Sequence, residues 1–253
     1  MLAEYLVRSR LNNYRQQVDA ARCCIEQAAA KGPMIVAVSL GKDSVALLDL
    51  AIETLGRVEA MRVTSSYALP GGGAVLEYFQ RRCMLHEIAP RLSLEETIAW
   101  LQNHGLGIER TKNANAGKKR KTDVALEWVR SHGYAVELLG MRAEESRGRR
   151  QCFRIRGLLY RAHGLWIGNP LGWWSARDTW AYIASRGLPY HPLYDCETHG
   201  ETRETLRNSG WLTVPRRLGV GPGVDSRVAW LRAHYPEQYH ALVTAFPSTR
   251  SLA

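Results

Sequence analysis

Apolar residues recur at helical spacing through the first thirty positions and then gather into short runs. From residue 3 to residue 31 they return every three or four positions, which predicts one amphipathic helix that ends at Gly32-Pro33. Met34 to Val38 is a continuous apolar run, typical of a buried parallel strand. Helical spacing resumes from Ser44 to Leu55. The chain therefore opens with helix, strand and helix in direct succession.

The same alternation continues along the chain. Further strands are predicted over 58–63, 83–88, 135–139 and 164–167, and further helices over 74–82, 94–104, 123–132, 175–186 and 225–245. Residues 112–121 predict a polar, lysine-rich loop. Because strands alternate with short helices, we expect an α/β fold with a mostly parallel twisted sheet and helices on both faces. We expect one domain over residues 1–195 and a helical or irregular C-terminal extension over 196–253.

The composition bears on the location of the protein in the cell and on the chemistry of its cysteines. No apolar run reaches the roughly 20 residues that span a bilayer, and the first residues lack the apolar segment of a secretory signal. We therefore expect a cytoplasmic protein without a membrane partner. The five cysteines form no C-x-x-C pair, so we expect neither a disulfide framework nor an iron–sulfur cluster.

Charge points to anionic ligands. The formal net charge is +10, and residues 110–161 alone hold 14 Lys or Arg against 5 Asp or Glu. Such a stretch is either a solvated basic face or a surface for nucleotides, nucleic acid or a protein partner. Trp173 and Trp174 follow it and are candidate stacking platforms for bases.

The segment VAVSLGKDSVALLDLA joins a strand, a tight turn and a helix. Gly41 lets the backbone approach a ligand, and the N–H groups that open the next helix favour an anion. Lys42 can supply a cation, and Asp43 can orient a neighbour or bind a metal. Serine hydroxyls on both sides can donate hydrogen bonds. The segment predicts a phosphate-binding loop formed by Ser39, Leu40, Gly41, Lys42, Asp43 and Ser44.

This loop lacks the G-x-x-x-x-G-K-[ST] form of the Walker A motif. It resembles the S-x-G-K-D-S loop of the adenine nucleotide α-hydrolase superfamily, which includes the ATP pyrophosphatases and the phosphoadenylyl-sulfate (PAPS) reductases. A second motif of the PAPS reductase family is G-x-R-x-x-[EQD]-S with a further arginine behind it. LLGMRAEESRGRR has this form in Gly140, Arg142, Glu145, Ser146 and Arg149. A guanidinium at the carboxyl end of a strand can bind a phosphate or sulfate with two hydrogen bonds.

Two weaker matches extend the resemblance over residues 33–195. NPLGWWSARDTWAYIASRGLPYHPLYD, residues 169–195, is similar to a family stretch that we take as a sign of fold rather than of chemistry. Family members often carry a lysine before the helix that precedes the G-x-R strand. Lys121 is a match to this position, and the register leaves Lys118 and Lys119 as alternatives.

The chain also departs from the family. The reductases end in a catalytic cysteine motif, whereas the last eight residues here, FPSTRSLA, contain no cysteine. Cys196 lies in an acid–Cys–x–x–His arrangement but directly after the P-L-Y motif, so it is only a weak candidate nucleophile. The turn after the second strand is also unusual, although Ser65 can still face the nucleotide. These differences suggest a changed substrate.

The resemblance implies an enzyme of sulfur metabolism that binds ATP or PAPS. It would cleave at the α-phosphate or transfer sulfur or a sulfonucleotide, with Lys42, Asp43 and Arg142 as catalytic residues. Mg²⁺ is expected with ATP, whereas the residues themselves predict no resident metal site. A sulfurtransferase that modifies DNA or tRNA and a non-catalytic nucleotide sensor remain alternatives. A homodimer is a further possibility.

Overall fold

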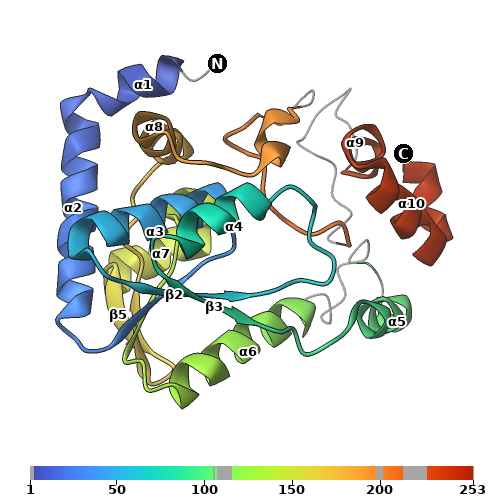
Figure 1. The fold of residues 1–253 in the computed structure, drawn as a ribbon, viewed down its shortest axis with the longest axis horizontal. Helices are drawn as coiled ribbons and strands as arrows, with labels where there is room; N and C mark the ends of the chain where they lie inside the picture. Colours follow the sequence, from blue (N-terminus) through green and yellow to red (C-terminus); the bar gives the residue numbers. More distant parts are fainter. Residues whose placement is uncertain (1–2, 105, 107–115, 198–201, 213–226, 253) are drawn as a thin grey trace. The chain divides into compact units, whose positions relative to one another are not determined.

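The computed structural model describes residues 3–104, 106, 116–197, 202–212 and 227–252, without the side chains of 116–122 and 252. The chain forms two compact units. The first comprises Met1–Arg62, Gly72–Ile88 and Leu126–His191, and the second comprises Val63–Gly71, Ala89–Ala125 and Pro192–Ala253 (Figure 1). The predicted division between residues 195 and 196 stays a prediction.

The first unit is built on a six-stranded sheet in the order β3-β2-β1-β4-β6-β5. Its strands are β1 (Met34–Ala37), β2 (Glu59–Val63), β3 (Met84–Ile88), β4 (Val136–Leu138), β5 (Leu159–Ala162) and β6 (Leu165–Gly168). Strand β1 pairs in parallel with β2 and β4, and β4 pairs in parallel with β6. The mostly parallel sheet predicted from the sequence is therefore confirmed.

Strand β5 differs from the prediction, because it was not expected and it pairs antiparallel with β6. His163 and Gly164, both with positive φ angles of 54° and 80°, form the turn between the two strands. The sequence LYRA carries no clear strand signal, since it is short and lies at the edge of the sheet.

Helices cover both faces of the sheet. Helices α3 (Lys42–Leu55) and α4 (Gly73–Gln80) lie over one face, and the C-terminal part of α6 (Ala116–Ser131) lies under the other (Figure 1). Residues 45–48 of α3 are completely buried, which makes this helix the centre of the core. Helix α6 begins at Ala116, so the prediction of a loop through residue 121 was wrong for its last six residues.

The predicted N-terminal helix is in fact two helices, α1 (Ala3–Ser9) and α2 (Asn12–Ala29). The Ser9 hydroxyl donates to the Leu6 carbonyl at 2.7 Å, and Leu11 adopts an extended backbone conformation, so the helix is interrupted between them. Helix α8 (Ala176–Arg186) begins after Ser175, as the sequence predicted. Helix α7 (Arg147–Arg156) was not predicted, because its sequence has little apolar periodicity.

The longer regular elements that the structure describes in the second unit are helices. It contains α5 (Leu94–His104), α9 (Arg227–His234) and α10 (Pro236–Ala245), and 3₁₀ turns over Pro192–Asp195 and Pro247–Leu252. Pro236 at the first position of α10 separates it from α9, where the sequence predicted one helix. The helical C-terminal extension is thus confirmed. No helix among the described residues is long and apolar enough to cross a membrane.

Candidate nucleotide site

The order of the strands places two predicted motifs side by side. The chain leaves β1 towards β2 on one side and later returns to β4 on the other side. Ligands of open α/β sheets bind at the carboxyl ends of strands where the order reverses in this way. The segment after β1 is the predicted phosphate loop, and the segment after β4 contains Gly140 and Arg142.

Gly140 is the point of closest approach between these two segments. A Cβ atom on Gly140 would lie 3.1 Å from the backbone carbon and oxygen of Asp43 and from the backbone nitrogen of Ser44. That spacing is tighter than ordinary van der Waals contact, so a side chain here would push the two segments apart. The glycine of the G-x-R motif therefore lets the end of β4 rest against the phosphate loop.

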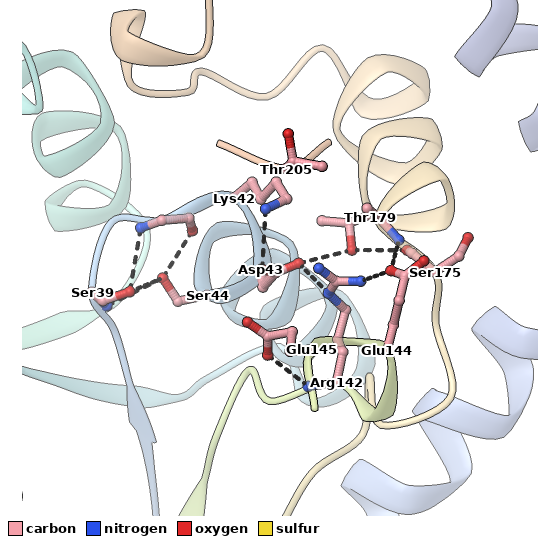
Figure 2. Close-up of polar contacts among 12 residues, drawn as sticks. Ser39, Lys42, Asp43, Ser44, Arg142, Glu144, Glu145, Ser175, Thr179 and Thr205 are labelled. Atoms are coloured by element: carbon pink, nitrogen blue, oxygen red, sulfur yellow. Dashed lines mark hydrogen bonds and ion pairs between the residues drawn. The ribbon is translucent and has the colours of Figure 1, made fainter. Parts of the chain in front are cut away.

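The phosphate loop is held by its own serines (Figure 2). The backbone N–H of Ser39 donates to the Ser44 hydroxyl at 3.1 Å, and that hydroxyl donates to the Gly41 carbonyl at 2.9 Å. Leu40 between them has a φ angle of +56°, in the left-handed region that non-glycine residues seldom adopt. The tight turn thus holds a residue with a strained backbone next to the amino end of α3, as is common at ligand sites.

The amino end of α3 is arranged to receive an anion. Gly41 occupies the N-cap position and supplies no side chain to cap the helix. The first N–H groups of a helix have no intrahelical acceptor, and the helix dipole places partial positive charge there. Lys42 opens the helix and is buried, with its ammonium 3.6 Å from the Asp43 carboxylate.

Asp43 joins three segments that are far apart in sequence. Its Oδ1 atom accepts a hydrogen bond from Arg142 Nε at 2.7 Å and another from the Thr179 hydroxyl at 3.0 Å (Figure 2). Its Oδ2 atom faces Lys42. The Asp43 carboxylate therefore orients the phosphate loop, the end of β4 and the first turns of α8 relative to one another.

Arg142 lies between two carboxylates. Besides Asp43 it contacts Glu144, and its side chain is only 4% exposed. Glu144 in turn accepts a hydrogen bond from the backbone N–H of Ala176 at 2.7 Å, at the start of α8. The guanidinium that was predicted to bind phosphate is thus held by carboxylates of the protein, and a ligand must share it with them.

Helices α3 and α8 are tied together along their length. Asp49 of α3 is fully buried and accepts hydrogen bonds from the Tyr182 hydroxyl at 2.9 Å and from Arg186 at 3.2 Å. Arg186 also pairs with Glu53 at 2.7 Å. Because Asp43 meets Thr179 at one end and Glu53 meets Arg186 at the other, both helices begin at the same edge of the sheet.

The rest of the second motif forms the start of α7. The Ser146 hydroxyl caps this helix by accepting from the backbone N–H of Arg149 at 3.2 Å. The Arg149 side chain pairs with Glu145, whose carboxylate also accepts from the backbone N–H of Arg142 at 3.2 Å. The motif therefore folds as one compact corner, in which Arg142 and Arg149 each have a carboxylate partner.

Several residues of this neighbourhood were missed by sequence reasoning. Thr179 and Glu144 were not singled out, although they complete the contacts of Asp43 and Arg142. His191 is almost fully buried beside the loop: a Cβ atom on Gly72 would lie 3.4 Å from Leu40 Cδ1 and 3.5 Å from His191 Cδ2. The pattern LPYHPLYD contains this histidine and was taken only as a sign of the fold.

The binding and catalytic roles of all the predicted residues stay predictions, and three of them have no contact described above. Ser65 and Cys196 belong to the second unit, and the side chain of Lys121 lies outside the described residues. The Cys196 thiol contacts the Pro192 carbonyl at 3.8 Å. Burial and the nearby Asp195 carboxylate both raise the pKa of this thiol, which disfavours the nucleophilic thiolate.

Metal ligands do not gather in the described part of the chain. No group of three or more His, Cys, Asp or Glu side chains there could hold a metal ion. All five cysteines are unpaired. The expected absence of an iron–sulfur cluster and the expected Mg²⁺ stay predictions.

A glycine-capped helix at the reversal point of a mostly parallel sheet, with an arginine and a lysine beside it, is typical of nucleotide-binding α/β domains. The family model for the phosphoadenosine phosphosulfate reductase domain matches residues 33–216, so the chain belongs to that family, within the adenine nucleotide α-hydrolase superfamily.

Two curated relatives are similar to this chain. A phosphoadenosine 5'-phosphosulfate reductase of Gloeobacter violaceus is 28% identical over 168 residues, which are 64% of this chain and 66% of the relative. A sulfate adenylyltransferase subunit 2 of Azospirillum brasilense is 26% identical over 227 residues, 78% of this chain and 71% of the relative. The matches thus span about two thirds of these relatives.

Solved structures confirm the fold. The PAPS reductase of Candida auris in complex with phosphate aligns with a TM-score of 0.54 at 18% identity, over 74% of this chain and 90% of that one. The FMN adenylyltransferase of Candida glabrata, solved with FAD and pyrophosphate, aligns with a TM-score of 0.52 at 10% identity, over 76% of this chain and 65% of that one.

Proposed function

We propose that this protein is an enzyme that binds ATP or PAPS with its phosphates at the amino end of α3. It cleaves at the α-phosphate or transfers sulfur or a sulfonucleotide. The main support is the glycine N-cap of α3 together with the Arg142–Asp43–Thr179 contacts beside it. The helix end binds the anion, and Asp43 holds Arg142 where charge develops on the leaving group.

Between the two nucleotides we favour ATP. PAPS reduction by this family needs a nucleophilic thiol, and the raised pKa of Cys196 disfavours its thiolate. The sulfate adenylyltransferase relative is named for a nucleotidyl transfer. This reaction requires only that the attack on the α-phosphate be aligned and that the charge of pyrophosphate be neutralised.

Mg²⁺ belongs to the ATP form of this proposal. Asp43 and the half-exposed Glu144 offer the carboxylate oxygens that Mg²⁺ prefers, and phosphate oxygens and water would complete its shell. When bound, the ion would neutralise pyrophosphate. Lys42 and Arg142 would act on the phosphates directly, since both lie against Asp43 at the helix end.

Product analysis tests this function. The protein is incubated with ATP and Mg²⁺, or with PAPS and thioredoxin, in the presence of sulfate and other acceptors. Release of pyrophosphate and AMP or an adenylylated product from ATP is expected. Sulfite from PAPS, abolished by Cys196→Ser, would instead identify a thiol reductase. Binding of either nucleotide by calorimetry without any product would identify a non-catalytic nucleotide sensor and contradict the proposal.

A nucleic acid is the second candidate for the acceptor. Helix α7 starts at the corner formed by the G-x-R motif, carries five arginines and has no acidic residue. Transfer of sulfur or a nucleotidyl group to DNA or tRNA would use such a surface to hold the polymer. Supplying tRNA or single-stranded DNA in the product assay tests this candidate, which fails if neither is modified.

The cytoplasmic location and a homodimer remain parts of the proposal, and light scattering tests the dimer.

A further inference from the structure

Helix α7 presents a stripe of arginines to solvent. Arg147, Arg150 and Arg154 are all exposed, and their i, i+3, i+7 spacing places them on one side of the helix. Together they cover about 10 Å along the helix axis. None of the three forms an ion pair with another residue that the structure describes. The arginine stripe is therefore a row of cations without protein counter-ions in the described part of the chain.

Other arginines of this region are held by the protein and contrast with the stripe. Arg149 pairs with Glu145, and Arg156 donates to the Arg161 carbonyl at 2.9 Å while lying 4.5 Å from the centre of the Tyr160 ring. The helix thus uses one side to pack within the first unit and leaves the arginine stripe on the other.

An aromatic side chain lies beside this helix. Trp173 is 43% exposed and packs edge-on against Phe153 of α7, with ring centres 6.2 Å apart. Trp174, which the sequence also suggested as a stacking platform, is 1% exposed and donates to the Gln17 carbonyl at 3.2 Å. The stacking prediction was therefore wrong for Trp174, which belongs to the core.

We propose that the arginine stripe and Trp173 bind a single-stranded segment of nucleic acid. Guanidinium groups in a row match successive phosphates, and an exposed indole stacks on an unpaired base. Duplexes keep their bases stacked and would not use Trp173. An acidic protein would satisfy the arginines but would give the indole no base to stack on.

The position of the stripe links it to the nucleotide site. Helix α7 begins directly after Ser146, four residues beyond Arg142. A strand that lies along the stripe would reach the edge of the site at the N-terminal end of the helix. The inference deepens the second candidate function. Only a reaction on the bound strand rests on that function, because binding of the strand is measured without turnover.

Fluorescence anisotropy with labelled single-stranded RNA and DNA of about 20 nucleotides, and with the matching duplex, tests the inference. The stripe variant is Arg147→Gln, Arg150→Gln, Arg154→Gln. The matched control changes three exposed arginines of the first 22 residues, Arg10→Gln, Arg15→Gln and Arg22→Gln, and so removes the same charge elsewhere. Circular dichroism and thermal melting verify folding. Affinities are measured from about 50 to about 200 mM salt.

The wild type and the control are expected to bind single strands with the same salt dependence. The stripe variant should lose at least about tenfold in affinity near 100 mM salt, and its salt slope should fall by about 2, since each phosphate contact contributes about 0.7. Trp173→Ala should lose at least about fivefold for single strands but not for the duplex.

Three outcomes would overturn the inference: no binding of either strand at low salt, equal losses in the stripe variant and the control, or a stripe variant that binds oligonucleotides normally but loses polyglutamate. The last outcome would assign the stripe to an acidic protein. Calorimetry with ATP and PAPS on the same proteins distinguishes a failure of this inference from a failure of the proposed function. Nucleotide affinity should be equal in all variants, and its absence from the wild type would count against the nucleotide site alone.

Discussion

Helices α3 and α8 begin at the same edge of the sheet, but their amino ends are capped differently. The end of α8 is filled by side chains of the protein: Ser175 and Asp178 form a capping box, and Glu144 accepts from the next N–H. The end of α3 has glycine at the N-cap. Asp43 in its first turn faces Arg142 and Thr179.

The difference separates a structural helix end from one available to a ligand. Both ends carry the partial positive charge of a helix dipole, which attracts an anion. In α8 the anions are carboxylates of the chain, so this end contributes to stability. In α3 the nearby carboxylate is directed to an arginine, so we expect this end to bind a phosphate group of a ligand. The comparison predicts that exchanging the caps exchanges the roles.

Gly41→Asp is expected to have the largest effect, because it gives α3 a carboxylate cap like that of α8. The Gly41 backbone, at φ −78° and ψ 157°, suits any residue. We expect nucleotide affinity to fall at least about 100-fold, or about 3 kcal/mol, measured by calorimetry. Stability should rise by a few tenths of a kcal/mol, because aspartate caps better than glycine.

Asn12→Asp serves as the control for Gly41→Asp. It adds one carboxylate to the first turn of α2, at an exposed position. Nucleotide affinity should stay within about twofold of the wild type, since added charge at a distant helix end is screened by salt. Normal nucleotide binding by Gly41→Asp would show that the end of α3 does not hold the phosphates.

Glu137 sharpens the comparison, because this carboxyl group is buried in the middle of β4 rather than at a helix end. Burial raises the pKa of Glu137 to about 7. The folded state therefore binds its proton more tightly than the unfolded state does. This contribution to stability is complete below about pH 4.5 and is lost as the pH rises through about 7, by at most about 3 kcal/mol.

Urea unfolding of Glu137→Gln at pH 5 and pH 8 measures this loss. The wild type should lose more stability between the two pH values than the variant, because glutamine does not titrate. Glu26→Gln, at an exposed position of α2, should behave like the wild type. An equal loss in the wild type and in Glu137→Gln would mean that the Glu137 carboxyl is not perturbed in the fold.

Gly140→Ala tests the contact between β4 and the phosphate loop. Its Cβ would press on the backbone of Asp43 and Ser44 at 3.1 Å. We expect nucleotide affinity to fall about tenfold, or about 1.4 kcal/mol, as the loop shifts by a few tenths of an ångström. Gly148→Ala is the control, since a Cβ there meets nothing within 4 Å. If both variants bind equally well, the close approach is not needed for binding.

Ser175→Ala should have the smallest effect, and on stability alone. The Ser175 hydroxyl accepts from the backbone N–H of Asp178 at 3.1 Å, and losing such a cap costs about 1 kcal/mol. Nucleotide affinity should stay within about twofold. Ser131→Ala, at the end of α6, should change stability by less than about 0.5 kcal/mol. A large loss of affinity in Ser175→Ala would show that α8 also takes part in ligand binding.

Local sequence signals are enough to predict much of the fold. The apolar run of β1, the glycine turn and the periodicity of α3 follow one another, so the amino-acid pattern alone predicts this strand–turn–helix junction. The bounds of α5 and the Ser175 cap were also predictable, because both depend on neighbours in the chain. The resemblance of several motifs to one superfamily agrees with the alternation of strands and helices.

The rest of the fold and of the candidate site depends on contacts between residues that are distant in the sequence. Nothing near Thr179 in the sequence indicates that its hydroxyl meets Asp43, 136 positions away. Helix α7 was hidden because arginines replace the apolar periodicity that marks a helix, and β5 because an edge strand needs few apolar residues. The burial of Trp174 could not be told from the exposure of Trp173, since they are adjacent and identical.

The three-way contact of Asp43 has a consequence for how descendants of this protein can change. Asp43, Arg142 and Thr179 lie in separate stretches of the gene. A substitution of Asp43 removes the shared acceptor of the guanidinium and the hydroxyl, and a substitution of Arg142 or Thr179 removes one of the two donors to Oδ1 of Asp43. Lineages that keep the chemistry should therefore retain Asp43, Arg142 and Thr179 as a set. Lineages that abandon it should lose all three within a short evolutionary interval, which would mark them as relatives retained for another purpose.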